Sequence, residues 1–187
     1  MSKKPKYIAL DVESGGVTSG TSLLSLYVTI LDSDFNMIDE MDLKIKPDDG
    51  IYYVTAEAMA VNGINLIEHD KEAITERQAG SKLYTFLNKN NPGGEVKLLP
   101  IGQNVGFDIE FVIEKLIAKG SWEKYVSYRL LDTGVIAQYL KLLGKIPESV
   151  SGGLSSLVEF FGVEKREAHI AKNDVLMTVD VLRSMLK

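Results

Sequence analysis

Residues 7–16 read YIALDVESGG, and they carry the most informative pattern of this chain. The pattern predicts a short buried strand that ends in two carboxylates, Asp11 and Glu13, followed by a flexible glycine turn. Because side chains alternate along a strand, both carboxylates point to one face, while Leu10 and Val12 point into the opposite layer. Two carboxylates so close at the end of an apolar strand are electrostatically costly unless a cation lies between them. A divalent metal ion is the usual solution, because hard cations take oxygen ligands; two solvated carboxylates are the alternative.

The composition predicts a single globular domain. The chain has 187 residues, of which 45% are hydrophobic and 25% are charged. This suits one domain whose core is large enough to need no disulfide or structural metal. Cysteine is absent, which excludes disulfides, thiolate zinc sites and a cysteine nucleophile and agrees with a reducing compartment. We expect one domain over residues 1–187, with a flexible basic terminus at residues 1–6.

The sequence predicts neither membrane insertion nor a surface for long duplex DNA. No run approaches the roughly 18 apolar residues of a membrane span. Only residues 7–10 separate the basic terminus from Asp11, which is too short for a signal peptide, so a cytoplasmic protein is expected. The net charge of −5 argues against a surface that grips duplex phosphates. It does not exclude a nucleic-acid enzyme, because bound metal ions reverse the local sign of their carboxylates.

Hydrophobic periodicity predicts an α/β fold. Residues 22–31 and 37–46 are expected to form a hairpin, which joins the first strand in a three-stranded antiparallel start and leaves its second strand half exposed near an edge. Further strands are expected at residues 96–101 and 129–133. The expected helices are residues 55–62 (capped by Thr55 and closed by Gly63), 70–90, a helix through 109–117 that stops at Gly120, 134–143, 154–161 and 173–187. Helices therefore flank a mixed sheet.

Two further groups of polar residues lie at expected helix starts. Asn104 can cap the middle helix, and Asp108 lies near its first turn, where the helix dipole tolerates a carboxylate. Five residues separate His169 from Asp174, so about 500° of helix would place them on different faces. His169 is therefore expected on the loop before the last helix, with Asp174 in its first turn. The other of the two histidines, His69, is expected to be solvated.

The order of these groups resembles the three motifs of the DEDD superfamily of 3′→5′ exonucleases. Asp-x-Glu ends the first strand, Asn-x-x-Phe-Asp opens a middle helix at residues 104–108, and His-x-x-x-x-Asp opens the last helix at residues 169–174. Two lesser features agree, namely the helix that ends in Asn-Gly-Ile at residue 64 and Leu-Asp-Thr at residues 131–133. The tyrosine form of the last motif would have tyrosine where Ile170 stands, so the chain resembles the DnaQ-like, or DEDDh, branch.

This resemblance implies a fold and a reaction. The fold is the ribonuclease H-like mixed β-sheet, with its first three strands antiparallel and helices on both sides. The reaction is metal-dependent 3′→5′ exonuclease hydrolysis of phosphodiester bonds at the 3′ ends of single-stranded DNA or RNA, which releases 5′-mononucleotides by a two-metal mechanism. Two divalent cations, Mg²⁺ or Mn²⁺, would be held by Asp11, Glu13, Asp108 and Asp174. His169 would be the general base, which completes the set of expected catalytic residues.

Six residues are expected to bind the substrate. Gly15 and Gly16 would let the backbone approach the terminal nucleotide, and apolar side chains would pack against the last bases. Each apolar candidate is equally compatible with core packing, and Asn104 either contacts the substrate or caps its helix. The expected binding residues are Ser14, Gly15, Gly16, Met59, Asn104 and Phe107. The first motif continues as Ser-Gly-Gly where relatives more often have Thr-Thr-Gly, which affects substrate preference.

Several alternatives stay open at the level of sequence. The runner-up is a catalytically silent DnaQ-like module that binds nucleic acid or protein, and a third reading is an unrelated phosphohydrolase that releases inorganic phosphate. The choice between DNA and RNA depends on the environment of the 2′-OH, which sequence does not place. No polymerase-binding tail is visible, so a polymerase partner is not expected. A homodimer is one alternative, because small family members of similar size trim RNA ends as homodimers.

Overall fold

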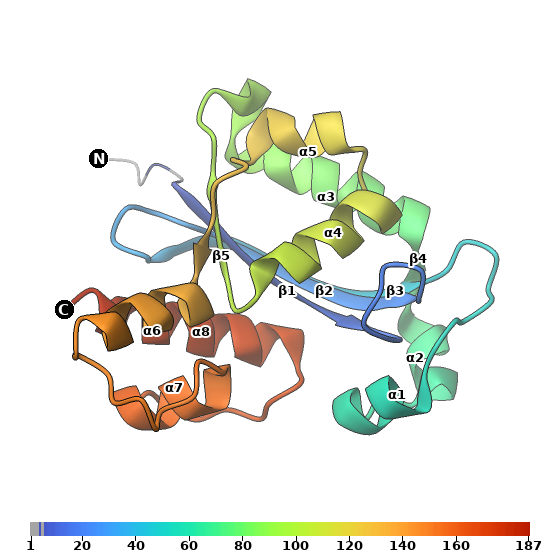
Figure 1. Ribbon diagram of the computed structural model, residues 1–187. Coiled ribbons are helices and arrows are strands. Elements are labelled where there is room, and N and C mark those ends of the chain that lie inside the picture. Colours follow the sequence, from blue (N-terminus) through green and yellow to red (C-terminus); the bar gives the residue numbers. More distant parts are fainter. Residues whose placement is uncertain (1–3, 5) are drawn as a thin grey trace.

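A six-stranded mixed sheet forms the centre of the protein (Figure 1). The computed structural model describes residue 4 and residues 6–187, so the expected flexible terminus falls largely outside the described residues, at residues 1–3 and 5. The strand order is β4-β3-β2-β1-β5-β6. The strands are β1 Tyr7–Ser14, β2 Leu23–Leu31, β3 Met37–Lys46, β4 Ile74–Thr75, β5 Leu99–Gly102 and β6 Leu131–Asp132. The predicted mixed sheet is confirmed, because β1, β2 and β3 pair antiparallel whereas β5 and β6 add in parallel.

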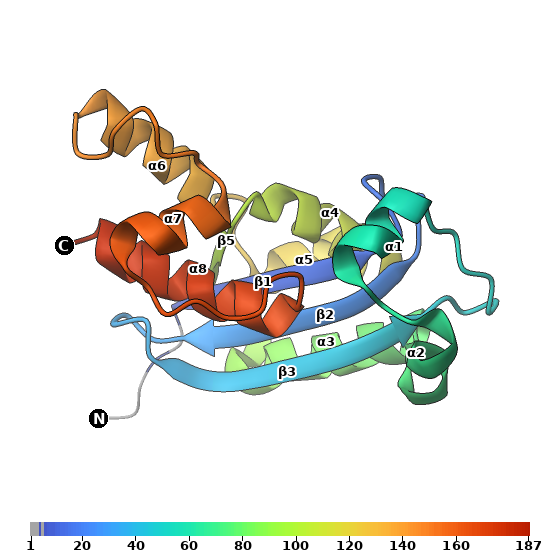
Figure 2. The same ribbon diagram turned by 90° about the horizontal axis from the view of Figure 1, so that it is seen from below.

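Helices cover both faces of this sheet (Figures 1 and 2). The helices are α1 Ala56–Asn62, α2 Leu66–Glu72, α3 Glu76–Asn90, α4 Val105–Lys115, α5 Lys119–Tyr125, α6 Thr133–Leu142, α7 Leu154–Phe161 and α8 Ala171–Met185, with a short 3₁₀ helix at Pro92–Gly94. Helices α3, α4 and α5 lie on one face, where Leu10 and Val12 of β1 enter the main core. Helix α8 lies on the other face against Tyr7 and Ala9, and α6 and α7 pack against α8. Because side chains alternate along β1, this strand contributes to the hydrophobic cores on both faces of the sheet.

Two predicted helices are corrected by the structure. The helix expected at residues 70–90 is two helices, because α2 is capped by the Asn65 side chain and α3 starts with a capping box between Thr75 and Gln78. The three extended residues between them include β4, which pairs with β3 at Ile45. The helix expected to stop at Gly120 already ends at Lys115, and α5, which sequence analysis missed, contains that glycine.

Two smaller expectations also differ from the structure. His69 is buried instead of solvated, at 7% exposure, and a ring nitrogen lies 2.8 Å from the carbonyl oxygen of Ile45. The strand expected to begin at residue 96 begins at Leu99, because Leu98 forms only an isolated bridge with Val126.

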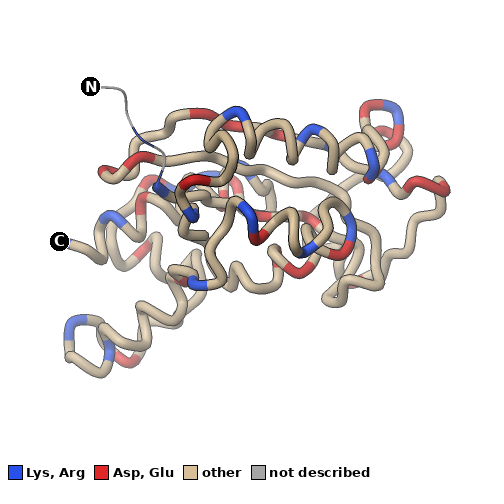
Figure 3. Tube along the Cα trace, turned by 90° about the horizontal axis from the view of Figure 1, so that it is seen from above, with Lys and Arg blue, Asp and Glu red and all other residues tan. Residues whose placement is uncertain are grey.

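Two further features of the described residues are the distribution of charge and the length of the helices. Lys and Arg are interspersed with Asp and Glu along the described chain (Figure 3). Within residues 4 and 6–187, none of the helices combines the length and the apolar character needed to cross a membrane.

Asp132, at the end of β6, holds the starts of two helices. Its Oδ1 accepts from the backbone N–H groups of Gly134 and Val135 at 2.9 and 3.2 Å, which caps α6. Its Oδ2 accepts from the N–H of Val105 at 3.1 Å, which is the first residue of α4. Asn104 stands at the capping position of α4 but has a left-handed backbone (φ 56°), and its side chain makes no capping hydrogen bond. The capping role considered for Asn104 is therefore wrong, and Asp132 performs it.

We predict that Asp132→Ala lowers the free energy of unfolding by about 2 to 3 kcal/mol, because two helix starts lose their acceptor. Asn104→Gly is the matched control and should change it by less than about 0.5 kcal/mol, because glycine suits the positive φ and no cap is lost. Denaturant unfolding monitored by circular dichroism measures both. Equal effects of the two variants would contradict this assignment.

Candidate active site

The carboxylates of β1, Asp11 and Glu13, lie just beyond the part of the strand that helix α8 covers. Tyr7 and Ala9 pack beneath α8, and the same face of the strand continues with Asp11 and Glu13. Helix α8 begins at Ala171, which is buried in this same core. The apolar face thus becomes acidic at the start of the helix, and the predicted common orientation of Asp11 and Glu13 is confirmed. A register shift after Glu13 marks the end of regular pairing with β2.

The first turn of α8 and the loop before it supply the next two groups. Asp174 lies in the first turn of the helix, and His169 lies two residues before Ala171 with a left-handed backbone (φ 62°). The backbone N–H of His169 donates to Asp174 Oδ2 at 3.1 Å. The predicted placement of His169 on a loop and of Asp174 in the first helical turn is confirmed.

Three carboxylates converge at this point. Asp11, Glu13 and Asp174 each offer one oxygen atom, and these atoms lie within 4.8 Å of one another. The Oδ1 atom of Asp174 is buried and has no hydrogen-bond partner, although a buried polar oxygen without a partner is costly. The convergence and the orphaned oxygen together indicate the place of a cation.

Asp108 joins this group from the opposite side of β1. Strand β5 pairs with β1 only as far as Ala9, so the N–H of Val12 needs another acceptor. The buried side chain of Asp108, in the first turn of α4, accepts this N–H at 2.9 Å through Oδ1. Asp108 is not one of the three residues whose oxygens lie within 4.8 Å of one another. It borders the cluster closely enough that its charge acts on Asp11.

The electrostatics of the cluster show mutual repulsion. Burial, followed by the charges of Asp108, Glu13 and Asp174, raises the pKa of Asp11 well above its usual range. Burial and the charge of Asp174 raise the pKa of Glu13 to about 7. Burial also raises the pKa of Asp108 and of Asp174, although backbone N–H groups oppose both shifts. With pKa values of about 8 and about 7, Asp108 and Glu13 would each hold a proton for much of the time at neutral pH without a cation.

The residues present fit a hard divalent cation. The donor set consists of carboxylate oxygens, which suit Mg²⁺ and Mn²⁺, and His169 is the only imidazole near it among the described residues. A cation would supply the partner that Asp174 Oδ1 lacks and would offset the burial and the charge repulsion that raise the pKa of Asp11. Asp11, Glu13 and Asp174 could hold one such ion directly, with Asp108 beside them.

A groove of about 530 Å³ adjoins Glu13. Its floor is the end of β1 and the turn after it, one wall is α1, and Phe107 of α4 closes another side. Most of its lining is apolar, and Val17 and Val61 at its rim are 87% and 58% exposed. An apolar groove beside a carboxylate cluster can hold a flat, partly apolar ligand with its polar end at the cluster.

The structure divides the six expected binding residues into two groups. Ser14, Gly16 and Phe107 line the groove. Gly15 lies behind it, where a Cβ atom would come within 2.5 Å of the carbonyl oxygen of Tyr53. Met59 and Asn104 are not among the lining residues, although Asn104 is exposed. For Gly15, packing already requires the absence of a side chain.

Sequence reasoning missed the residues of α1 that form the wall of the groove. These residues are Thr55, Glu57, Ala58, Val61 and Asn62. The Asn62 side chain donates to the carbonyl oxygen of Ser14 at 3.1 Å and accepts from the N–H of Ile64 at 3.0 Å, which fixes α1 against the end of β1. The Asn-Gly-Ile pattern at the end of α1 was the sequence signal for this wall, because its asparagine makes a hydrogen bond to the end of the first strand.

Comparisons of sequence and of structure give different results. The chain matches no protein-family model and no curated protein by sequence. By structure it is similar to exonuclease I, in the structure reported to suggest how processivity is achieved, with a TM-score of 0.79 and 22% identity over 97% of this chain. It is also similar to E. coli exonuclease I in complex with a dT13 oligonucleotide (TM-score 0.75, 20% identity, 96% of this chain) and to the zinc-bound form of the E. coli exonuclease I–ssDNA complex (0.75, 20%, 97%).

These likenesses establish the fold. The chain has the ribonuclease H-like fold of exonuclease I, as the resemblance of its motifs implied. It spans 40% of the length of each of these three exonuclease I chains.

The electrostatics of the cluster predict how metal-free stability depends on pH. The pKa of Glu13 is higher in the folded protein, at about 7, than its ordinary value of 4.5, so the folded state binds the proton more tightly. The stabilisation is complete below about pH 4.5 and is lost as the pH rises through about 7. After allowance for solvent screening, we expect Glu13 to contribute a loss of about 2 kcal/mol, or about 4 to 8 °C in Tm, in EDTA.

Glu13→Gln isolates this contribution from other titrating groups. The difference in Tm between the variant and the parent protein in EDTA should grow in favour of the variant from pH 5 to pH 8. Mg²⁺ or Mn²⁺ should raise the Tm of the parent protein at pH 8 and much less at pH 5, because protons compete with the ion. A constant difference across this range, together with no response to either ion, would refute the assignment.

Proposed function

We propose that the chain is a DEDDh-type, DnaQ-like 3′→5′ exonuclease that hydrolyses phosphodiester bonds at the 3′ ends of single-stranded DNA or RNA and releases 5′-mononucleotides. The observation that carries the proposal is the convergence of Asp11, Glu13 and Asp174, with the unpartnered Asp174 Oδ1, beside an apolar groove. The likeness of the fold to exonuclease I in complex with a dT13 oligonucleotide supports it. The catalytic residues in this proposal are Asp11, Glu13, Asp108, His169 and Asp174.

The carboxylates would bind two Mg²⁺ or Mn²⁺ ions. When bound, such ions activate water as a nucleophile and stabilise the oxygen that leaves the phosphorus atom. Asp11 belongs to the convergent group and also feels the charge of Asp108, so it would help to hold both ions. Asp108 also holds the end of β1 in place through the Val12 N–H, which keeps Asp11 and Glu13 at a fixed separation.

His169 would accept the proton of the attacking water. It lies on the loop just before α8 and is exposed, so a substrate phosphate could reach it. The hydrogen bond from its backbone to Asp174 keeps the imidazole near one metal ligand. An imidazole in this position can remove the proton as the new bond to phosphorus forms, and general-base catalysis of this kind contributes about 10²–10⁴-fold in rate.

The groove would hold the terminal nucleotide. Phe107 and Val61 offer apolar surface for a base, and the carboxylate of Glu13 lies at the end of the groove where the 3′-terminal phosphodiester would meet the cations. Ser14 and Gly16 also line the groove, so their backbone could contact the sugar.

Product analysis tests the proposal directly. We expect 5′-labelled DNA or RNA oligonucleotides to shorten from the 3′ end with Mg²⁺ or Mn²⁺ and to stay intact in EDTA. Asp108→Ala and His169→Ala should each lower kcat at least about 100-fold, or about 2.7 kcal/mol in the barrier. Cleavage that survives both substitutions would exclude this mechanism. Binding of oligonucleotide without cleavage by the parent protein would support the silent binding module, and release of inorganic phosphate would support the phosphohydrolase.

A bulky residue in the groove should separate binding from chemistry. We predict that Val61→Trp raises KM for an oligonucleotide about tenfold or more and changes kcat less than threefold, because it fills the groove without touching the carboxylates. Ile67→Trp is the matched control, since Ile67 is 74% exposed on α2 and does not line the groove. Steady-state kinetics of both variants provide the measurement, and equal KM values would contradict the placement of the nucleotide.

A further inference from the structure

The loop that carries His169 is fastened to helix α8 at several points. It runs from Gly162, after α7, to Ile170, before α8. Near its end, the Asn173 side chain donates to the carbonyl oxygen of Glu167 at 3.0 Å. In its middle, the backbone N–H of Arg166 lies 3.4 Å from the Met177 sulfur. The loop therefore follows α8 instead of extending into solvent.

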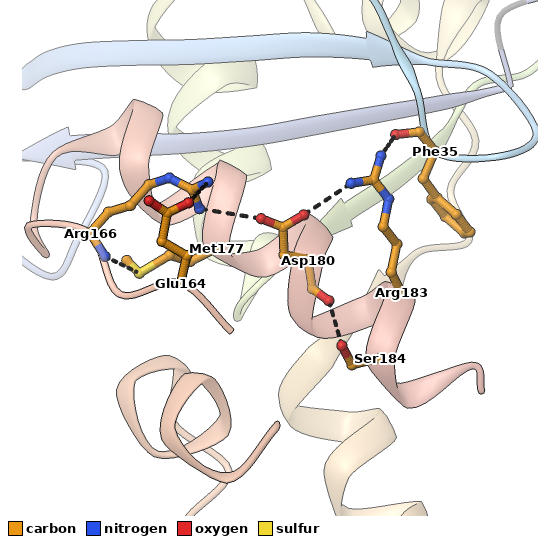
Figure 4. Close-up of polar contacts among 7 residues, drawn as sticks. All are labelled: Phe35, Glu164, Arg166, Met177, Asp180, Arg183 and Ser184. Atoms are coloured by element: carbon orange, nitrogen blue, oxygen red, sulfur yellow. Dashed lines mark hydrogen bonds and ion pairs between the residues drawn. The ribbon is translucent and has the colours of Figure 1, made fainter. Parts of the chain in front are cut away.

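A third attachment is an ion-pair network around Asp180 (Figure 4). Asp180 Oδ2 lies 3.3 Å from Arg166 Nη1, and its Oδ1 accepts from Arg183 Nη1 at 2.9 Å. Arg183 in turn donates to the carbonyl oxygen of Phe35, in the turn between β2 and β3. One carboxylate thus joins the loop, through Arg166, to helix α8 and, through Arg183, to the sheet.

This network is sheltered from water. The side chains of Arg166, Asp180 and Arg183 are 24%, 31% and 38% exposed, whereas the side chains of exposed pairs such as Lys44 and Glu72 are 54% and 66% exposed. A partly buried carboxylate between two guanidinium groups is held more firmly than a solvated pair, because screening is weaker and the charge-assisted hydrogen bonds have fixed geometry. Phe35 also stacks on Tyr7, with ring centroids 4.7 Å apart, which fixes the far end.

We infer that Arg166 and Asp180 are positioning residues for His169. Arg166 is three residues before His169 on the same loop, and no described carboxylate of the metal cluster contacts Arg166 or Asp180. The network sets the path of the loop, and the path of the loop sets where the imidazole meets the substrate. This inference rests on the proposed function for its kinetic consequence, while the positioning itself is a property of the metal-free protein.

Kinetics provide the first test. Asp180→Asn and Arg166→Met should each lower kcat about tenfold, with KM and the apparent Mn²⁺ affinity changed less than twofold, because a misplaced base slows the chemical step while the groove and carboxylates stay intact. Arg166→Lys, which keeps the charge, should retain more activity than Arg166→Met. The matched control is Asp39→Asn, because Asp39 is 24% exposed and pairs with Lys89 at 2.7 Å on the other side of the sheet. Its kcat should equal that of the parent protein.

A double-substitution cycle separates positioning from general destabilisation. In the His169→Ala background, Asp180→Asn should lower the residual rate less than twofold, because the group through which it acts is gone. The same tenfold loss in both backgrounds would overturn the inference. An unchanged kcat for Asp180→Asn in the parent protein would overturn it as well.

The two histidines allow a test that does not depend on activity. His169 and the buried His69 give the only imidazole NMR signals of the chain, and His69 serves as an internal reference. Asp180→Asn and Arg166→Met should shift the His169 signals toward those of an unstructured histidine and leave those of His69 in place. Unmoved His169 signals in folded variants would refute the positioning role, whereas an inactive parent protein would refute only the proposed function. If Asp180→Asn fails to fold, Arg166→Met decides, because it leaves the Asp180–Arg183 pair intact.

Discussion

The burial of four carboxylates near one point is the constraint on which this structure depends. Burial raises the pKa values of Asp11, Glu13 and Asp174, and the charges of neighbouring carboxylates, Asp108 first for Asp11, raise those of Asp11 and Glu13 further. A metal-free protein would gain stability by separating them. The fold instead holds them together from three directions, through β1, through the start of α4 and through the start of α8. This arrangement is costly without a cation and favourable with one.

Helices α4 and α8 are each fixed by a contact that is not part of the cluster. Asp132 caps α4 and α6 together, which sets the first turn of α4 and hence Asp108. Lys172 pairs with Glu40 at 3.1 Å, and Glu40 also accepts from Tyr27, which faces Asp11 across the β1–β2 pair. These bonds anchor the first turn of α8 to β2 and β3. The acidic site therefore draws its rigidity from polar contacts around its margin.

The sequence alone predicted the features of the fold that depend on apolar spacing and on turn residues. The strand that ends in Asp11 and Glu13, the antiparallel start and the last two helices follow from apolar spacing and turn residues. The loop position of His169 follows from its separation from Asp174. The features that the sequence did not predict depend on long-range contacts. One of them is His69, whose ring is buried against the carbonyl group of Ile45. Helix α4 is capped by Asp132 instead of by Asn104, which lies 28 positions earlier. The adjacent ends of β5 and β6 bring Asp132 to the start of this helix. The wall of the groove on α1 and the Arg166–Asp180 pair likewise join residues that no local pattern connects.

In the proposed mechanism, the convergent carboxylates bind two divalent cations. The most direct measurement is an anomalous difference map from crystals of the protein soaked with Mn²⁺. We expect two peaks about 3.5–4 Å apart, within coordination distance of Asp11, Glu13, Asp108 and Asp174, with Asp11 bound to both. An empty cluster in crystals that bind Mn²⁺ elsewhere, or a single peak coordinated mainly by water, would contradict it.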